Sequence, residues 1–321
     1  MNNSTDLIVD ALKKYNTFSI LPHINPDADT IGSCFAIKYI LEKMGKSAVI
    51  YLSDTLPKHL SFINGEYQVF DKAQKCDVCI CIDCGDIGRI DGREAVFNAS
   101  DIKINIDHHY ANTRYADINL VDAAACSAGE ICYNLIKKLG VDFDKTVAEY
   151  IYCAMCADTG GFKYSNTTPK AMRIAADLLE YEIDSARINK LLFDTESYDI
   201  MRLKGEITNK VELYCDGAVG VVYVRYDMLD KYGIGEKEID NIVDIARRID
   251  GVEVAVSVKE CSASTKISLR SNEYIDVSKI AETFGGGGHV RASGFIIKDD
   301  FETAKQKVID EVIKTVKEYK K

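Results

Sequence analysis

Potential metal ligands gather in a short segment near the N-terminus. His23, Asp27 and Asp29 lie within one stretch of seven residues, directly after the apolar run 18–21. Pro26 disfavours a helical conformation for the residue before it, so we expect the segment to begin as a loop. Imidazole together with carboxylate ligands favours Mn²⁺, Fe²⁺ or Zn²⁺ over ions that prefer oxygen ligands alone. The spacing therefore predicts part of a transition-metal site.

Two further apolar runs end in aspartates. Asp83 follows residues 78–82, and Asp107 follows residues 102–106. The carboxyl ends of parallel strands meet at one edge of an open sheet, and ligands bind beyond that edge. If both runs are strands of the same sheet as the first run, we expect both aspartates to lie near the first segment.

Three more candidate ligands complete the set. His108 and His109 follow Asp107 directly, and Asp158 follows an apolar stretch that predicts a helix over residues 150–157. Together these groups exceed what one tetrahedral or octahedral ion with an open position needs. Two ions about 3.5 to 4 Å apart, bridged by one carboxylate, would use them all, and such pairs act on phosphate esters. The pattern predicts a two-metal phosphoesterase.

The elements that must position these residues follow a pattern that predicts an α/β domain. Apolar runs alternate with helical spacing, which predicts a doubly wound, mainly parallel sheet covered on both faces. The predicted strands are residues 18–21, 48–52, 78–82 and 102–106. Helices are expected over residues 31–44, 127–139, 145–156 and 169–180, and from residue 184 onward.

The second half of the chain changes character. Residues 191–213 are charged and poor in Gly and Pro, which favours a helical connector between a domain over residues 1–190 and a smaller α/β domain over residues 214–321. Alternating valines over 252–258, followed by Ile267 and Leu269, predict neighbouring half-buried strands of a mixed sheet. The last residues show helical apolar spacing, which predicts an amphipathic helix packed on that sheet.

A glycine cluster in the second half of the chain is the candidate substrate-binding site. Consecutive glycines allow backbone N–H groups to approach a phosphate closely, and nearby polar or cationic side chains add to this. The cluster and its neighbours are Gly285, Gly286, Gly287, Gly288, His289 and Arg291. A flexible turn beside a strand is the alternative interpretation. Arg270 lies on the opposite face from Ile267 and Leu269, and either contacts phosphate or is a solvated edge charge.

Composition limits the partners. The chain has 321 residues and a formal net charge of −10, which disfavours wrapping long nucleic acid because that binding depends on cationic side chains. No apolar run reaches the length of a membrane span, and the N-terminus lacks a signal-peptide pattern, so we expect a cytoplasmic protein without membrane contact.

The eleven cysteines raise an alternative metal site. Cys76, Cys79, Cys81 and Cys84 include two CxxC spacings, which are also typical of zinc ligands. The apolar run 78–82 favours a buried strand instead, so we interpret these side chains as buried, reduced thiols.

These motifs together identify a family resemblance. The segment from His23 to Asp29, the strand-end Asp83, the triplet Asp107-His108-His109 and Asp158 resemble the four ordered motifs of the DHH phosphoesterase superfamily. The glycine cluster followed by Arg291 resembles the signature of the DHH-associated C-terminal domain, DHHA1. The resemblance covers almost the whole chain, and every motif position is intact.

The resemblance implies a role for each motif residue. It assigns His23 and Asp27 to one ion, and Asp29, His108 and Asp158 to the other. Asp83 bridges the two ions, for which Mn²⁺ is the expected metal. In the same resemblance Asp107 orients the imidazoles. His109 lies toward the scissile phosphate, where it stabilises charge or protonates the leaving oxygen.

A catalytic domain joined directly to the associated domain is similar to the bacterial nanoRNase branch. That likeness implies hydrolysis of short oligoribonucleotides, from dimers to pentamers, to mononucleotides, and of pAp to AMP and phosphate. An alternative is a phosphodiesterase for cyclic or linear dinucleotides such as c-di-AMP, pApA and pGpG. An inorganic pyrophosphatase and a non-enzymatic nucleotide-binding regulator rank lower. The assembly state is open, with a homodimer as one alternative.

Overall fold

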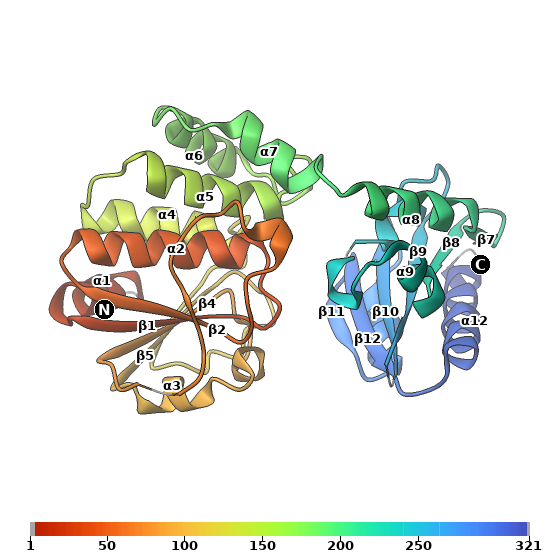
Figure 1. The fold of residues 1–321 in the computed structure, drawn as a ribbon, viewed down its shortest axis with the longest axis horizontal. Coiled ribbons are helices and arrows are strands. Elements are labelled where there is room, and N and C mark those ends of the chain that lie inside the picture. The colour runs from red at the N-terminus through yellow and green to blue at the C-terminus, as the bar shows by residue number, and fades with distance from the viewer. Residues whose placement is uncertain (1–3, 73, 240, 263, 320–321) are drawn as a thin grey trace. The chain divides into compact units, whose positions relative to one another are not determined.

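The chain divides into two compact units between Thr195 and Glu196 (Figure 1). The computed structural model describes residues 4–72, 74–239, 241–262 and 264–319. Both units are α/β, which confirms the predicted fold class. None of the helices within the described ranges combines the length and apolarity that a bilayer span needs.

The first unit contains a six-stranded parallel sheet in the order β3-β2-β1-β4-β5-β6. Its strands are β1 (Thr17–Pro22), β2 (Ser47–Leu52), β3 (Gln68–Val69), β4 (Val78–Ile82), β5 (Ile102–Asp107) and β6 (Ile118–Val121). The four predicted strands are confirmed. The structure adds the two short edge strands β3 and β6.

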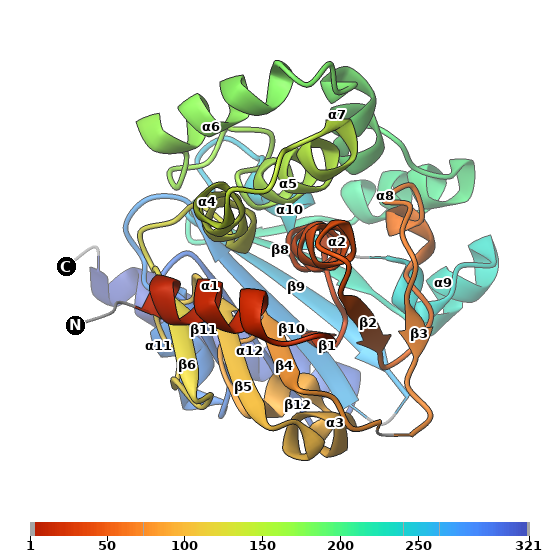
Figure 2. The ribbon, with the colours of Figure 1, turned by 90° about the vertical axis from the view of Figure 1, so that its left-hand side faces the viewer.

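Helices cover both faces of this sheet (Figure 2). On one face lie α1 (Ser4–Lys14), α2 (Ala28–Lys43), α4 (Ala128–Leu139) and α5 (Lys145–Asp158). The other face carries η2 (Ile87–Ile90) and α3 (Glu94–Ala99), and α6 (Pro169–Leu179) and α7 (Ser185–Phe193) follow α5. The strands alternate accordingly: Ile80 is buried against the first helix group, and Cys79 and Cys81 are buried against the second. All four cysteines of the CxxC spacings are buried free thiols.

The strand register brings the predicted ligands to one edge of the sheet. Pro22 of β1 pairs with Ile82 of β4, and Ile82 pairs with Ile106 of β5. The next residue on each strand is therefore at the same level. These residues are His23, Asp83 and Asp107.

The second unit contains a mixed sheet in the order β11-β12-β10-β9-β8-β7, in which only β8 and β9 are parallel neighbours. Its strands are β7 (Glu212–Tyr214), β8 (Val219–Val224), β9 (Val254–Cys261), β10 (Ser264–Ser271), β11 (Gly287–His289) and β12 (Ala292–Ile297). The predicted strands around residues 252–258 and 267–269 correspond to β9 and β10.

Two apolar clusters stabilise the second unit. The closing helix α12 (Phe301–Tyr319) buries one face of the sheet with α11 (Val277–Thr283), as its amphipathic spacing predicts. The opposite face packs on α8 (Tyr198–Asn209), α9 (Tyr226–Tyr232) and α10 (Val243–Arg247). Over residues 191–213 the chain is helical in the end of α7 and in α8, which begins where the Ser197 side chain accepts a hydrogen bond from the Ile200 backbone.

Candidate metal centre

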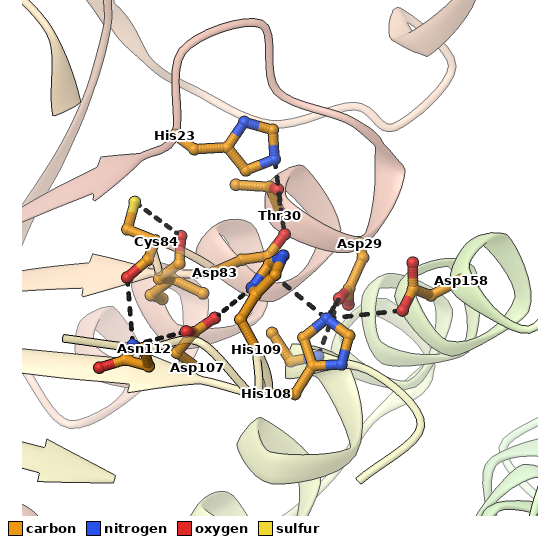
Figure 3. Close-up of polar contacts among 12 residues, drawn as sticks. His23, Asp29, Thr30, Asp83, Cys84, Asp107, His108, His109, Asn112 and Asp158 are labelled. Atoms are coloured by element: carbon orange, nitrogen blue, oxygen red, sulfur yellow. Dashed lines mark hydrogen bonds and ion pairs between the residues drawn. The ribbon is translucent and has the colours of Figure 1, made fainter. Parts of the chain in front are cut away.

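Asp83 lies at the middle of the cluster (Figure 3). It follows β4 with a φ of 60°, a left-handed conformation that is uncommon outside glycine and asparagine, and its N–H donates to the Ile106 carbonyl at 2.9 Å. Only 3% of the residue is exposed. The hydrogen bond and the turn fix the carboxylate between the histidines that follow β1 and β5.

The two oxygens of Asp83 face two different groups of potential ligands. Its Oδ2 lies 3.5 Å from His23 Nε2, which is 3.9 Å from an oxygen of Asp27. Its Oδ1 lies 3.5 Å from His108 Nε2. The second group continues from the same nitrogen, which lies 3.8 Å from Asp29 Oδ2 and 3.5 Å from Asp158 Oδ2.

These separations fit ions better than hydrogen bonds. Two ligand atoms about 2.1 Å from a common ion lie about 3 to 4 Å apart, whereas hydrogen bonds between nitrogen and oxygen are mostly shorter than about 3.2 Å. The Asp83 Oδ1 atom is buried and accepts no hydrogen bond among the described residues. A buried, unsatisfied carboxylate oxygen is costly unless a cation is its partner. The donor set therefore fits divalent metal ions, as DHH-type motifs require.

Thr30 supports the first group and was not found from the sequence. Its hydroxyl donates to Asp83 Oδ2 at 2.6 Å, and its backbone N–H donates to the Asp27 side chain at 3.0 Å. Asp27 is the N-cap of α2, so the first helical turn necessarily brings Thr30 beside it. The sequence feature that could have identified Thr30 is its position three residues after Asp27, which is where an N-cap side chain accepts a backbone hydrogen bond.

Asp29 is held by the start of another helix. The backbone N–H groups of Ala128 and Gly129, in the first turn of α4, donate to its two oxygens at 2.8 and 3.0 Å. These N–H groups and the positive end of the helix favour the carboxylate anion. Burial acts in the opposite sense and raises the pKa of Asp29. A nearby cation would therefore stabilise the carboxylate anion in addition to the N–H groups of α4.

Gly129 leaves no room for a side chain at this contact. A Cβ added there would lie 2.6 Å from the Cβ of Ala154 on α5. We expect Gly129→Ala to lower the free energy of unfolding by about 1 to 3 kcal/mol, because the two helices must separate, and to lower activity because α4 then moves from Asp29. Urea unfolding measures the first effect, and the rate of hydrolysis by the metal-loaded variant measures the second.

Gly205→Ala is the matched control for this prediction. Gly205 lies within α8, and a Cβ there would meet nothing within 4 Å. This variant should gain up to about 1 kcal/mol from helix propensity alone. Equal stability changes in the two variants would contradict the packing argument.

Asp107 and His109 form a contact beside the ligand groups. His109 Nδ1 lies 2.7 Å from Asp107 Oδ1, and Asn112 Nδ2 donates to Asp107 Oδ2 at 2.5 Å. Asp107 is completely buried, whereas a third of the His109 side chain is exposed. The hydrogen bond to Asp107 raises the pKa of His109, which favours its protonated form. Asn112, which lies in the loop after the triplet, was not found from the sequence.

The charged cluster shifts the pKa values of its members. Burial alone would lower the pKa of His108, but its contact with Asp83 and the charges of Asp29 and Asp158 raise it to about 10. Burial raises the pKa of Asp158 to about 7. Burial alone would raise the pKa of Asp83, but its contacts with His108 and His23 lower it below the usual range.

Metal binding should release protons. In the metal-free protein His108 is protonated at neutral pH, and a metal ligand must be neutral imidazole. Asp158, with a pKa of about 7, must also be deprotonated as a ligand. We therefore expect at least one proton to leave per protein molecule when metal binds at pH 7, and metal affinity to fall as the pH falls. Calorimetric titration in two buffers of different ionisation enthalpy measures the protons released. Identical heats in both buffers would contradict this prediction.

The candidate substrate residues all lie in the second unit. Arg291 donates to the carbonyl oxygens of Glu273 and Ile275, and to the Ser271 hydroxyl, so its guanidinium holds the loop after β10. His289 is exposed on the edge strand β11. A phosphate contact by either side chain stays a prediction.

Two of the predicted glycines are required by packing. A Cβ at Gly286 would lie 2.3 Å from the Cβ of Phe295, and one at Gly288 would lie 2.5 Å from the Ala292 carbonyl oxygen. Gly287, by contrast, has open space. Close strand packing is thus a second reason for this glycine cluster, beside the predicted approach of phosphate.

Arg270 lines a cationic cavity of about 140 Å³ on the second sheet. Lys259 and Lys266 are directly paired across β9 and β10, and both line the same cavity with Ser257 and Ser268. Arg270 is half-buried there. Cationic and hydroxyl side chains thus line the cavity, and Lys259 Nζ also donates to the Ile239 carbonyl oxygen at 3.2 Å.

Comparison with known proteins gives matches along nearly the whole chain. The "DHH family, N-terminal domain" matches residues 17–155, and the "DHHA1 domain" matches residues 216–321. The chain is 30% identical over 312 residues, 95% of this chain and 92% of the relative, to the "bifunctional oligoribonuclease and PAP phosphatase NrnA" of Thermus thermophilus. It is 29% identical over 290 residues to the protein of the same name from Bacillus subtilis, covering 89% of this chain and 91% of that relative.

A solved structure shows the same fold. An exopolyphosphatase-related protein from Bacteroides fragilis superposes with a TM-score of 0.90 at 26% identity, covering 99% of this chain and 96% of that one.

Proposed function

The chain belongs to the DHH family of phosphoesterases and carries a DHHA1 domain after its DHH domain, and from this we propose that it hydrolyses short oligoribonucleotides to mononucleotides and pAp to AMP and phosphate. The observation that carries the proposal is the near full-length similarity to relatives named for both activities. The intact cluster of histidines and aspartates supports it.

We propose two divalent ions as cofactors, with Mn²⁺ as the expected metal. His23 and Asp27 would hold one ion, Asp29, His108 and Asp158 would hold the other, and Asp83 would contribute one oxygen to each. Two groups of ligand atoms support this assignment, His23 with Asp27 and Asp83, and Asp29 with His108 and Asp158, and a third group joins Asp83 and His108 to His109. When bound, such ions polarise a phosphoryl oxygen and offset its charge.

His109 is the proposed proton donor. Its Nδ1 contacts Asp107 Oδ1 at 2.7 Å, and Nε2 is the proposed donor to the substrate. Asp107 raises the pKa of His109, which favours the protonated imidazole that would donate a proton to the leaving oxygen. In the second unit, Arg270, the glycine cluster, His289 and Arg291 are the proposed substrate contacts.

A product analysis with matched substrates tests the proposal. The protein is stripped of metal with EDTA, dialysed, and assayed with Mn²⁺ or Mg²⁺ on RNA dimers to pentamers, long RNA, pAp, c-di-AMP, pApA, pGpG and pyrophosphate. We expect no product without metal. With Mn²⁺ we expect mononucleotides from the short RNAs, AMP and phosphate from pAp, and little product from long RNA.

The other substrates separate the alternatives. Faster turnover of c-di-AMP or pGpG than of RNA dimers would favour a dinucleotide phosphodiesterase. Turnover of pyrophosphate alone would favour a pyrophosphatase. Nucleotide binding without any product would favour a regulator.

A further inference from the structure

Tyr110 follows the Asp107-His108-His109 triplet directly and is 89% exposed. Single exposed apolar side chains are common on protein surfaces, so exposure alone identifies no site. Its position in the chain is what matters, because consecutive Cα atoms are about 3.8 Å apart and His109 Nδ1 is itself 3.5 Å from Asp83. The backbone of Tyr110 thus lies beside the ligand cluster, and its exposed side chain is within reach of a bound substrate.

The backbone that carries Tyr110 is fixed by hydrogen bonds. The Asn112 N–H donates to the His109 carbonyl at 3.2 Å, which closes a turn with Tyr110 at its corner. The next residue, Thr113, donates its N–H to the Gly85 carbonyl at 2.9 Å. The turn is therefore closed by its own hydrogen bond and is attached to the loop that follows β4.

The Asn112 side chain attaches the same turn to two buried residues. Its amide nitrogen donates to Asn105 Oδ1 at 2.7 Å and to Asp107 Oδ2 at 2.5 Å, and both acceptor residues are completely buried. The side-chain oxygen of Asn112 accepts from the Arg114 N–H at 2.7 Å. The exposed Tyr110 ring is thus carried by a turn whose backbone is held in place relative to His109.

We infer that the Tyr110 ring is a stacking platform for the nucleobase next to the phosphate that is hydrolysed. This inference rests on the proposed function and deepens it. An aromatic face stacks on any base, and a tyrosine loses little conformational entropy because it has two side-chain torsions. The ring gives nothing to a base-free phosphate such as pyrophosphate. Tyr110 therefore selects nucleotides without selecting their sequence.

Steady-state kinetics of Tyr110→Ala and Tyr110→Phe test the inference. The substrates are an adenine dinucleotide and an abasic dinucleotide of the same length, assayed with the metal-loaded, full-length protein. For Tyr110→Ala we expect KM for the adenine dinucleotide to rise about tenfold or more, with kcat little changed, because stacking holds substrate before and during the reaction. The abasic substrate should show no difference, and Tyr110→Phe should behave like the wild type on both.

The outcomes separate the inference from the function on which it rests. Unchanged KM in Tyr110→Ala, or an equal loss on the abasic substrate, would overturn the stacking role while the proposed function stands. Absence of hydrolysis by the wild type on every nucleotide would overturn the proposed function and the inference together. Thermal unfolding of Tyr110→Ala should match the wild type, since the ring is exposed.

Discussion

Asp83→Asn should abolish hydrolysis, with kcat lower by about 1,000-fold or more. The carboxylate offers one oxygen to the group with His23 and the other to the group with His108. The amide replaces one of those anionic oxygens with an NH₂ group, which repels a cation and binds no metal. One proposed ion therefore loses a ligand atom, and the other keeps a neutral carbonyl oxygen in place of an anionic one. Asparagine is the appropriate replacement because it tolerates the φ of 60° better than other side chains.

Asp101→Asn is the control for this variant. Asp101 precedes β5 at the opposite end of the sheet, and its carboxylate lies 3.4 Å from Lys75 Nζ on the surface. The same chemical change there should leave kcat within about twofold, since exposed ion pairs contribute little. Metal titration should show weakened binding in Asp83→Asn alone. Activity of Asp83→Asn within tenfold of the wild type would contradict a bridging role.

The strand ends were predictable because a simple rule governs them. Buried parallel strands are continuous apolar runs, and their carboxyl ends share one edge, so the residues after β1, β4 and β5 had to approach one another. The start of α2 was less predictable. Apolar spacing begins at Ile31, but the helix begins at Ala28, because Asp27 caps it and its first turn faces the metal cluster.

Contacts that depend on tertiary structure were not predictable. Nothing local in the sequence marks Asn112, whose partners Asn105 and Asp107 approach it only when the loop after β5 folds back. The edge strands β3 and β6 are short and not fully buried, so they lack the apolar run that identifies the central strands. The partners of Arg291 were not predictable either, because nothing in the sequence indicates that its guanidinium donates to backbone carbonyl oxygens.

Asp107→Asn should lower kcat by about 100-fold through His109. The carboxylate contacts His109 through one oxygen and accepts from Asn112 through the other. In the amide, one of these positions becomes a donor, so either His109 loses its acceptor or two NH₂ groups meet. His109 then loses both its orientation and the anion that raises its pKa.

The pH profile distinguishes this role from a general loss of structure. If protonated His109 is the acid, activity disappears as the pH rises through its pKa, and removal of the Asp107 charge lowers that pKa. The alkaline limb of the kcat profile should therefore move to lower pH in Asp107→Asn. Asp122→Asn is the matched control, because Asp122 follows the neighbouring strand β6 and its side chain accepts only from the Ala124 N–H among its described hydrogen bonds. A uniform loss of activity at every pH in Asp107→Asn, without movement of the limb, would contradict the assignment of His109 as the acid and leave Asp107 with a purely structural role.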